Sequence, residues 1–219
     1  MPRRRPTKRP RAPPRTRADR QVRRRVQIIL GTRPEAIKLF PVIHALRDEP
    51  GLEVVVCSTG QHGAIADDVL SFAGVRPDEN LNLLRHGQSL DALTASAISA
   101  IGSSLDAHEP DWLIVQGDTT TAFASALAAH YRRIPLAHVE AGLRSGDMAQ
   151  PWPEEANRRM ITALAALHFA PTRLAADTLL TEQIDRASVH VTGNTVIDAL
   201  HWTAARIDAE PGLAEDVRA

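Results

Sequence analysis

Short apolar runs rich in β-branched residues alternate with longer helical stretches from Val26 onward. The runs are continuous, as expected for strands that are buried on both faces of a parallel sheet. Predicted strands cover residues 26–30, 52–58, 112–116, 135–139, 166–170 and 188–192, and predicted helices cover 34–48, 63–73, 90–107, 119–132, 155–165, 172–182 and 195–208. This alternation predicts an α/β fold with a doubly wound, Rossmann-like parallel sheet, whose ligands gather at the carboxyl ends of the strands.

A charge asymmetry separates the start of the chain from the rest. Residues 1–25 hold 12 of the 26 lysines and arginines, five prolines and a single acid, which leaves 14 bases against 25 acids elsewhere. Because this segment lacks apolar periodicity, we expect residues 1–25 to form a disordered basic tail. It could contact nucleic acid or an anionic surface, or it could be dispensable, including upstream sequence translated from a start codon placed too early. We favour the second explanation and expect no nucleic-acid partner.

Composition excludes several other classes. No apolar run reaches the roughly 18 residues that span a bilayer, so no membrane partner is expected. Cys57 is the only cysteine, which excludes an intrachain disulfide and a cysteine-based metal cluster and fits a cytoplasmic location. No arrangement with zinc-ligand spacing and no G-x-S-x-G segment is present, so we expect no metal site.

The first strand-to-helix junction reads GTRPEAIKLFP over residues 31–41. Thr32 and Glu35 have the spacing of a capping box. Backbone N–H groups at a helix start can face an anion, and Arg33 and Lys38 add positive charge. The junction is therefore a candidate anion site, although both cations could instead be solvated surface charges. It matches neither a P-loop nor a dinucleotide-binding fingerprint.

Two later junctions place carboxylates at the same edge of the sheet. Asp118 follows the strand 112–116, and Glu140 closes the strand 135–139. Asp118 could instead cap the next helix, a role that suits aspartate. His138 shares a strand face with Glu140 only if the strand is straight, and we interpret it as a packed core residue.

A third carboxylate follows a loop of unusual length for a compact α/β unit, residues 141–153. Glu154 and Glu155 come directly after it, where either could simply complement the helix dipole. Together, Asp118, Glu140 and Glu154 would lie at one edge of the sheet. Paired carboxylates can act as acid and base if their surroundings separate their pKa values.

Five segments occur in one order and spacing that is typical of a known family. They are GTRPEAIK (31–38), GDTTT (117–121), HVEAGLR (138–144), PWPEEANR (151–158) and VTGNTVIDAL (191–200). Over residues 26–208 the chain resembles the non-hydrolysing UDP-N-acetylglucosamine 2-epimerases.

The resemblance implies an architecture of two Rossmann-like domains that face each other across a cleft, the GT-B arrangement, in a homodimer. It assigns residues 26–208 to the N-terminal domain and residues 209–219 to the start of a linker, and it implies that the C-terminal domain is absent. In the family that domain supplies a catalytic histidine and most contacts to the nucleotide. The expected partners are therefore UDP-N-acetylglucosamine and either a second copy or a separately encoded C-terminal half.

The resemblance also implies a reaction. The family interconverts UDP-N-acetylglucosamine and UDP-N-acetylmannosamine by anti elimination and re-addition of UDP, without a redox or metal cofactor. By resemblance, Asp118, Glu140 and Glu154 are acid/base groups, and Arg33 and Lys38 lie near the diphosphate. The family serves cell-surface polysaccharide biosynthesis in the cytoplasm.

A second, activating substrate molecule binds to many bacterial members of the family. Gln61 and His62 match that site, but Gly63, Ala64 and Gly87 stand where many members carry longer polar side chains. We keep Gln61 and His62 as a possible allosteric site.

Several alternatives stay open. A catalytically inactive remnant or binding module of the same fold is the main one. A hydrolysing epimerase is disfavoured by Pro34 and Glu35, because that group has Ala-Asp there. A UDP-sugar glycosyltransferase would lack the pair of segments at 117–121 and 151–158.

Overall fold

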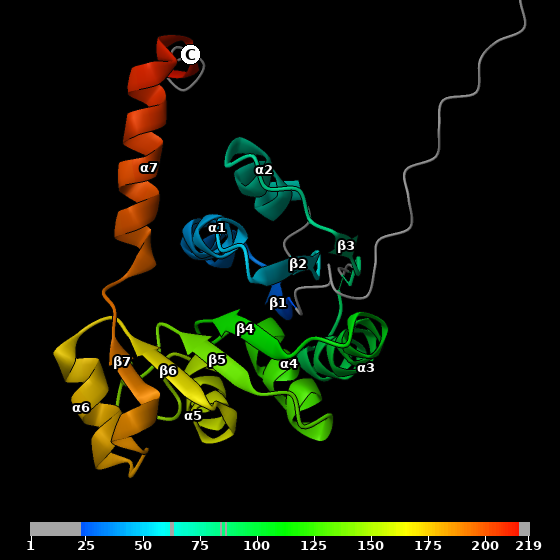
Figure 1. Ribbon diagram of the computed structural model, residues 1–219. Helices are drawn as coiled ribbons and strands as arrows, with labels where there is room; N and C mark the ends of the chain where they lie inside the picture. The colour runs from blue at the N-terminus through cyan, green and yellow to red at the C-terminus, as the bar shows by residue number, and fades with distance from the viewer. Residues whose placement is uncertain (1–22, 62–63, 84, 86, 215–219) are drawn as a thin grey trace, which may run out of the picture.

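The computed structural model describes residues 23–61, 64–83, 85 and 87–214. Most of the predicted basic tail, the end of the predicted linker and His62 lie outside these residues. The described chain folds into a parallel sheet with helices on both faces (Figure 1), which confirms the predicted α/β, Rossmann-like class.

Seven parallel strands form the sheet in the order β3-β2-β1-β4-β5-β6-β7. Their bounds are β1 Arg24–Leu30, β2 Leu52–Ser58, β3 Glu79–Asn80, β4 Trp112–Gln116, β5 Leu136–Val139, β6 Leu167–Ala170 and β7 Val189–Val191. Six strands match predictions, whereas β3 was missed because two residues leave no periodic signal. Strand β1 begins two residues earlier than predicted, since Arg24 and Arg25 already pair with β2.

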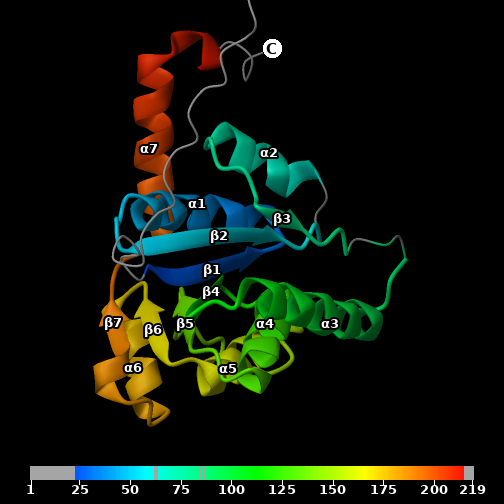
Figure 2. The same ribbon diagram turned by 45° about the vertical axis from the view of Figure 1, so that its right-hand side comes forward.

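The helices lie in two layers that Figure 2 separates clearly: α1, α2 and α7 on one face, and α3, α4 and α5 on the other. Their bounds are α1 Arg33–Arg47, α2 Ala64–Phe72, α3 Leu90–His108, α4 Thr120–Tyr131, α5 Glu154–Leu164, α6 Arg173–Thr181 and α7 Thr195–Ala209, with short 3₁₀ turns at Arg186–Ser188 and Pro211–Ala214. Every α-helix falls within one residue of its predicted bounds. None of the described helices is long and apolar enough to cross a bilayer.

Side-chain caps explain why these helices begin where they do. Thr32, Ser89, Thr119 and Thr172 each accept a hydrogen bond from the backbone N–H three residues later, and Asn194 accepts one from the N–H of Val196. A cap of this kind contributes about 1 kcal/mol to a helix start. The caps therefore fix the turns that leave the carboxyl ends of the strands.

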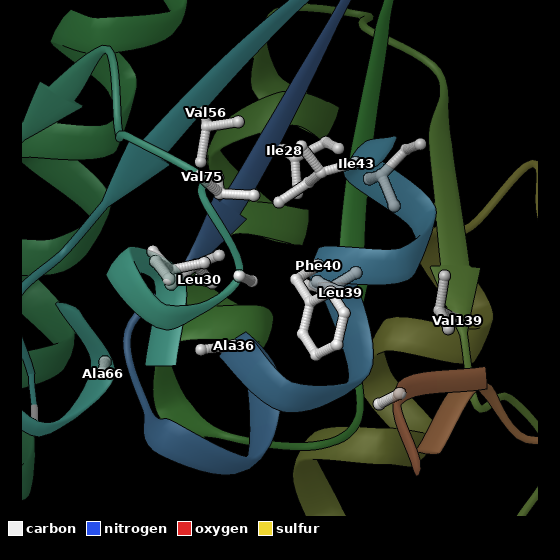
Figure 3. Close-up of a cluster of buried hydrophobic side chains, with 14 of the residues drawn as sticks. Ile28, Leu30, Ala36, Leu39, Phe40, Ile43, Val56, Ala66, Val75 and Val139 are labelled. Atoms are coloured by element: carbon white, nitrogen blue, oxygen red, sulfur yellow. The ribbon is translucent and has the colours of Figure 1, made fainter. Parts of the chain in front are cut away.

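The core lies on both faces of the sheet because alternate side chains of each strand point in opposite directions. Ile28 and Leu30 pack against Leu39 and Ile43 of α1 (Figure 3). Ile29 points to the opposite face and packs in a cluster with α4. Complete burial of such a side chain contributes roughly 1.5–3 kcal/mol.

Helix α7 follows β7 at the edge of the sheet and packs against α1. It therefore lies on the opposite face of the sheet from α6. The ring of Trp202 lies 5.1 Å from that of Phe40 and 6.0 Å from that of Phe72. The guanidinium of Arg206 stacks over Phe72 and Trp202 and donates to the carbonyl of Phe72 (2.6 Å). These contacts hold α7 against α1 and α2.

Gly31 directly follows β1 and lies close to two neighbouring side chains, so a larger residue does not fit there. A Cβ atom at this position would lie 2.2 Å from Thr59 Oγ1 and 2.7 Å from Thr121 Oγ1. Both hydroxyls are on buried residues, so neither can move aside freely. Gly51, in contrast, has open space where its Cβ would be.

We predict that Gly31→Ala lowers the free energy of unfolding by about 1–3 kcal/mol, the usual effect of overpacking a buried site. The matched control, Gly51→Ala, should change it by less than about 0.5 kcal/mol. Urea denaturation of both variants measures the difference. Equal effects would show that the close approach at Gly31 does not exist.

Candidate active site

A cavity of about 480 Å³ opens at the carboxyl ends of β1, β4 and β5. Strands β1 and β4 are neighbours, yet α1 and α4 leave them toward opposite faces, so the cavity lies at the topological switch point of the sheet. Its lining comprises Thr32, Pro34, Glu35, Lys38, Gln61, Leu90, Leu93, Gln116, Gly117, Asp118, Thr119, Thr120, Glu140, Leu143, Pro153 and Glu154. All three predicted carboxylates and Lys38 are therefore brought together.

Glu140 is the most constrained of the three carboxylates. Its Oε2 accepts from Lys38 Nζ at 2.6 Å and from Gln116 Nε2, and its Oε1 accepts from Asn194 Nδ2 at 3.0 Å. Its φ of +67° turns the side chain out of the strand alternation. Glu140 therefore does not continue the strand face of His138, because the extended conformation ends before it.

His138 is a buried core residue, as we interpreted it from the sequence. Its side chain is 1% exposed, and Nε2 lies 2.7 Å from the carbonyl oxygen of Gly117. Gly117 has a φ of +72° and leads directly into Asp118. His138 thus supports the turn that presents Asp118 to the cavity.

Asp118 is held from the side of α5. Its carboxylate pairs with Arg158, and its backbone carbonyl accepts from Asn157 Nδ2 at 2.9 Å. Burial raises the pKa of Asp118 above its usual value; Arg158 opposes this shift, while Glu154 and Glu140 reinforce it. The aspartate therefore does not cap α4, a role that Thr119 fills instead.

Glu154 and Glu155 have different positions despite being neighbours. Glu154 begins α5 and lines the cavity. Glu155 is fully buried, where it accepts from the backbone N–H of Ser145 (3.0 Å) and from Arg159 Nε (2.9 Å). Glu154 is thus available to a ligand, and Glu155 fixes the long loop that precedes α5.

Two backbone N–H groups at the start of α1 are already paired within the protein. The N–H groups of Gly31 and Thr32 both donate to Glu35 Oε2, at 2.9 and 2.7 Å. These two N–H groups are therefore not available to an external anion, and an anion site at Arg33 and Lys38 stays a prediction. Arg33 is exposed and is absent from the cavity lining, whereas Lys38 reaches into it.

Gln61 lies in the same cavity as the carboxylates. Its Oε1 accepts from Thr121 Oγ1 at 2.6 Å, and Thr121 lies against Thr59 at 3.2 Å. The structure therefore places Gln61 at the wall of the candidate active site, while His62 lies outside the described residues.

Three residues that contact the carboxylates were missed at the sequence level: Gln116, Arg158 and Asn194. Gln116 is the last residue of β4, at the same edge of the sheet as Asp118 and Glu140. Its position alone could therefore have identified it as a site residue. Arg158 is one turn beyond Glu154 on α5, a spacing that puts both on one helix face. Asn194 gave no such signal, because its capping role already explained it.

The arrangement suits proton transfer. Carboxylates with different partners surround one cavity, and the resulting difference in their environments is how paired acids acquire separate acid and base roles. Among the described residues, no group of three or more histidine, cysteine, aspartate or glutamate side chains is placed to hold a metal ion. The fold and the site together define a Rossmann-like protein with a carboxylate-lined cavity at its switch point.

Comparison with known proteins identifies the family. The family model described as UDP-N-acetylglucosamine 2-epimerase matches residues 44–218, and the chain belongs to this family. It is 48% identical over 183 residues to the UDP-N-acetylglucosamine 2-epimerase of Salmonella typhimurium, covering 84% of this chain and 49% of that protein. The Escherichia coli K12 enzyme is 44% identical over 195 residues, covering 89% and 52%. The chain thus spans about half the length of the curated relatives it matches.

Solved structures agree with this assignment. The UDP-GlcNAc 2-epimerase of Neisseria meningitidis, solved bound to UDP-GlcNAc, superposes with a TM-score of 0.82 at 45% identity, covering 85% of this chain and 51% of that one. A lipopolysaccharide outer core galactosyltransferase matches with a TM-score of 0.58 at 12% identity, which shows a shared fold alone. The chain therefore corresponds to one half of the GT-B architecture.

We predict that Lys38→Met lowers the free energy of unfolding by about 1–3 kcal/mol, because it leaves the largely buried Glu140 carboxylate without its cation. The control is Arg47→Met, whose partner Asp78 is 48% exposed at 3.6 Å and should contribute less than about 1 kcal/mol. Chemical denaturation measures the free energy of unfolding of both variants. Equal losses would contradict a stabilising role for the ion pair between Lys38 and Glu140.

A second prediction concerns pH. Burial lowers the pKa of His138 to about 4, against an unfolded value near 6.5. Between these two pKa values the unfolded chain binds more protons than the folded chain. The contribution of His138 to the free energy of unfolding is therefore complete above pH 6.5 and is lost as the pH falls toward 4. The loss is about 3 kcal/mol at most.

The stability difference between the wild type and His138→Gln isolates this contribution, because other titrating groups cancel. That difference should shift in favour of the variant between pH 7 and pH 4.5. A constant difference for His138→Gln would mean that His138 titrates normally.

Proposed function

We propose that this chain carries the acid/base half of the active site of a non-hydrolysing UDP-N-acetylglucosamine 2-epimerase. The observation that supports this most strongly is the convergence of Asp118, Glu140, Glu154 and Lys38 on one cavity at the switch point. Family membership supplies the substrate class, since a relative of the same fold was solved bound to UDP-GlcNAc.

Inversion at sugar carbon 2 requires bases on both faces of the ring. In the proposed first step one carboxylate removes the carbon-2 proton while the bond from carbon 1 to the UDP oxygen breaks, giving 2-acetamidoglucal and UDP. In the second step a protonated carboxylate returns a proton to the other face of carbon 2, and the UDP oxygen bonds to carbon 1 again. No electrons enter or leave overall, so the reaction needs no redox cofactor.

The structure suggests how the carboxylates divide these roles. Glu140 accepts three hydrogen bonds, one of them from the Lys38 ammonium, and these donors fix its carboxylate at the cavity. Burial raises the pKa of Asp118, which favours a group that can hold a proton. We therefore propose Glu140 as a resident base, Asp118 as a proton carrier and Glu154 as the third acid/base group, with Lys38 near the diphosphate.

The remaining contacts would come from the part of the family fold that this chain does not cover. We propose that the partner is either a second copy, in a homodimer, or a separately encoded C-terminal half. Arg33, which is exposed beside the cavity, would contact the diphosphate only after that second wall is in place. The proposed setting is the cytoplasm, where the product would enter cell-surface polysaccharide biosynthesis.

Proton exchange at carbon 2 tests this function directly. The chain is incubated with UDP-N-acetylglucosamine in heavy water, alone and with the C-terminal half of a relative, and the carbon-2 proton is followed by NMR. We expect loss of this signal and appearance of UDP-N-acetylmannosamine in the mixture. Free N-acetylmannosamine would indicate a hydrolysing epimerase, and silence in both samples would favour a non-catalytic member of the family.

The variants Asp118→Asn, Glu140→Gln and Glu154→Gln identify the groups involved. Each should slow exchange by about 10²–10⁴-fold, the usual contribution of a general acid or base. Glu49→Gln removes an exposed carboxylate at the far end of α1 and should leave the rate unchanged. An unaltered rate in all three site variants would contradict the proposed roles.

A further inference from the structure

Glu35 is a buried carboxylate that the proposed reaction does not use. The residue is 1% exposed and lies in the first turn of α1. Its Oε2 accepts from the N–H groups of Gly31 (2.9 Å) and Thr32 (2.7 Å), and its Oε1 accepts from Thr119 Oγ1 (2.6 Å). A simple capping box requires only the contact with Thr32.

The contact with Thr119 reaches a different helix on the other face of the sheet. Thr119 is the cap of α4, and its Oγ1 also accepts from the N–H of Ala122 at 3.0 Å. One hydroxyl thus caps α4 and donates to Glu35. The carboxylate consequently joins the start of α1 to the start of α4 across the β1–β4 boundary.

The hydrogen bonds around Glu35 favour its ionised form, whereas its burial favours the neutral acid. Its three hydrogen-bond partners in the described structure are all donors, and the positive ends of two helix dipoles point toward it. Burial raises the pKa of the Glu35 carboxyl group above its usual value, and these hydrogen bonds offset only part of that shift. Removing the carboxylate would leave two backbone donors and one hydroxyl unpaired in a buried site.

Asp118 immediately precedes Thr119. The hydrogen bond from Thr119 to Glu35 therefore also restrains one side of the turn that carries Asp118. The opposite side is held by Arg158 and Asn157 from α5. Without the contact between Thr119 and Glu35, the turn would keep its contacts with α5, with His138 and with the backbone of Val139, but it would lose its link to α1.

We propose that Glu35 is a positioning residue for the active site, whose carboxylate holds Thr119 and thereby fixes the orientation of Asp118 in the cavity. The proposal rests on the proposed function only in assigning Asp118 a role in proton transfer. It also implies that the diphosphate of a substrate does not bind the N–H groups of Gly31 and Thr32, because Glu35 already fills that position.

Four variants of the full chain test the proposal: Glu35→Ala, Thr119→Val, Thr119→Ser and the exposed control Glu49→Gln. The first readout is the titration of the Asp118 side-chain carbon by carbon-13 NMR. In Glu35→Ala and Thr119→Val the midpoint should fall by at least about half a pH unit, as a less fixed Asp118 becomes more solvated. Thr119→Ser keeps the hydroxyl and should match the wild type, as should Glu49→Gln.

The second readout is thermal unfolding with and without formate. The midpoint of Glu35→Ala should be lower than that of the wild type by more than about 5 °C. Sodium formate, which can replace the missing carboxylate, should raise that midpoint more than the same concentration of sodium chloride does. Formate should have no such specific effect on the wild type or on Glu49→Gln.

If Glu35→Ala does not fold, Thr119→Val and Thr119→Ser carry the test by themselves. An unchanged Asp118 midpoint in Thr119→Val would overturn the positioning role and leave Glu35 as a purely structural cap. These readouts do not depend on turnover. A failure of the proposed function would appear separately, as a wild-type chain that gives no exchange even with a C-terminal half.

Discussion

The side-by-side pairing of β1 with β4 determines where the rest of the structure can go. The chain runs outward from β1 to β3 and then returns to begin again at β4, so α1 and α4 must leave neighbouring strands toward opposite faces. A gap opens between the two helix starts, and the polar groups at the strand ends line it. Gly31 is required at this boundary because a side chain there would meet the two threonine hydroxyls beside it.

Negative charge is concentrated in this gap, and the surrounding residues compensate each carboxylate in a different way. Glu140 is paired with Lys38 and two amide groups, Asp118 with Arg158, and Glu35 with backbone N–H groups and a hydroxyl. A carboxylate held by a cation and one held by neutral donors respond differently to a proton or to an approaching ligand. A single cavity can therefore offer chemically distinct acids although the side chains are alike.

Most of the fold was predictable because its signals are local. Continuous apolar runs and capping residues placed every α-helix within one residue, and only the two-residue β3 escaped. The three carboxylates were found because each follows a strand end, and parallel strands end at one edge. Partners that lie far away in sequence were not predictable: Asn194 is 54 residues from Glu140, and Thr119 is 84 residues from Glu35. The hydrogen bond between Glu35 and the N–H of Gly31 is local but was also not predicted, since capping-box spacing indicates only the contact with Thr32.

Asn194 at the start of α7 performs two tasks with one amide group. Its Oδ1 accepts from the N–H of Val196, while its Nδ2 donates to Glu140. Serine, threonine and aspartate are ordinarily interchangeable with asparagine as helix caps. Here they are not, because an aspartate would set one carboxylate against another and a hydroxyl is too short to reach both partners. The usual tolerance of a helix start to substitution is thus lost at this position, and a change that a stability designer would consider neutral would alter the chemistry of the cavity.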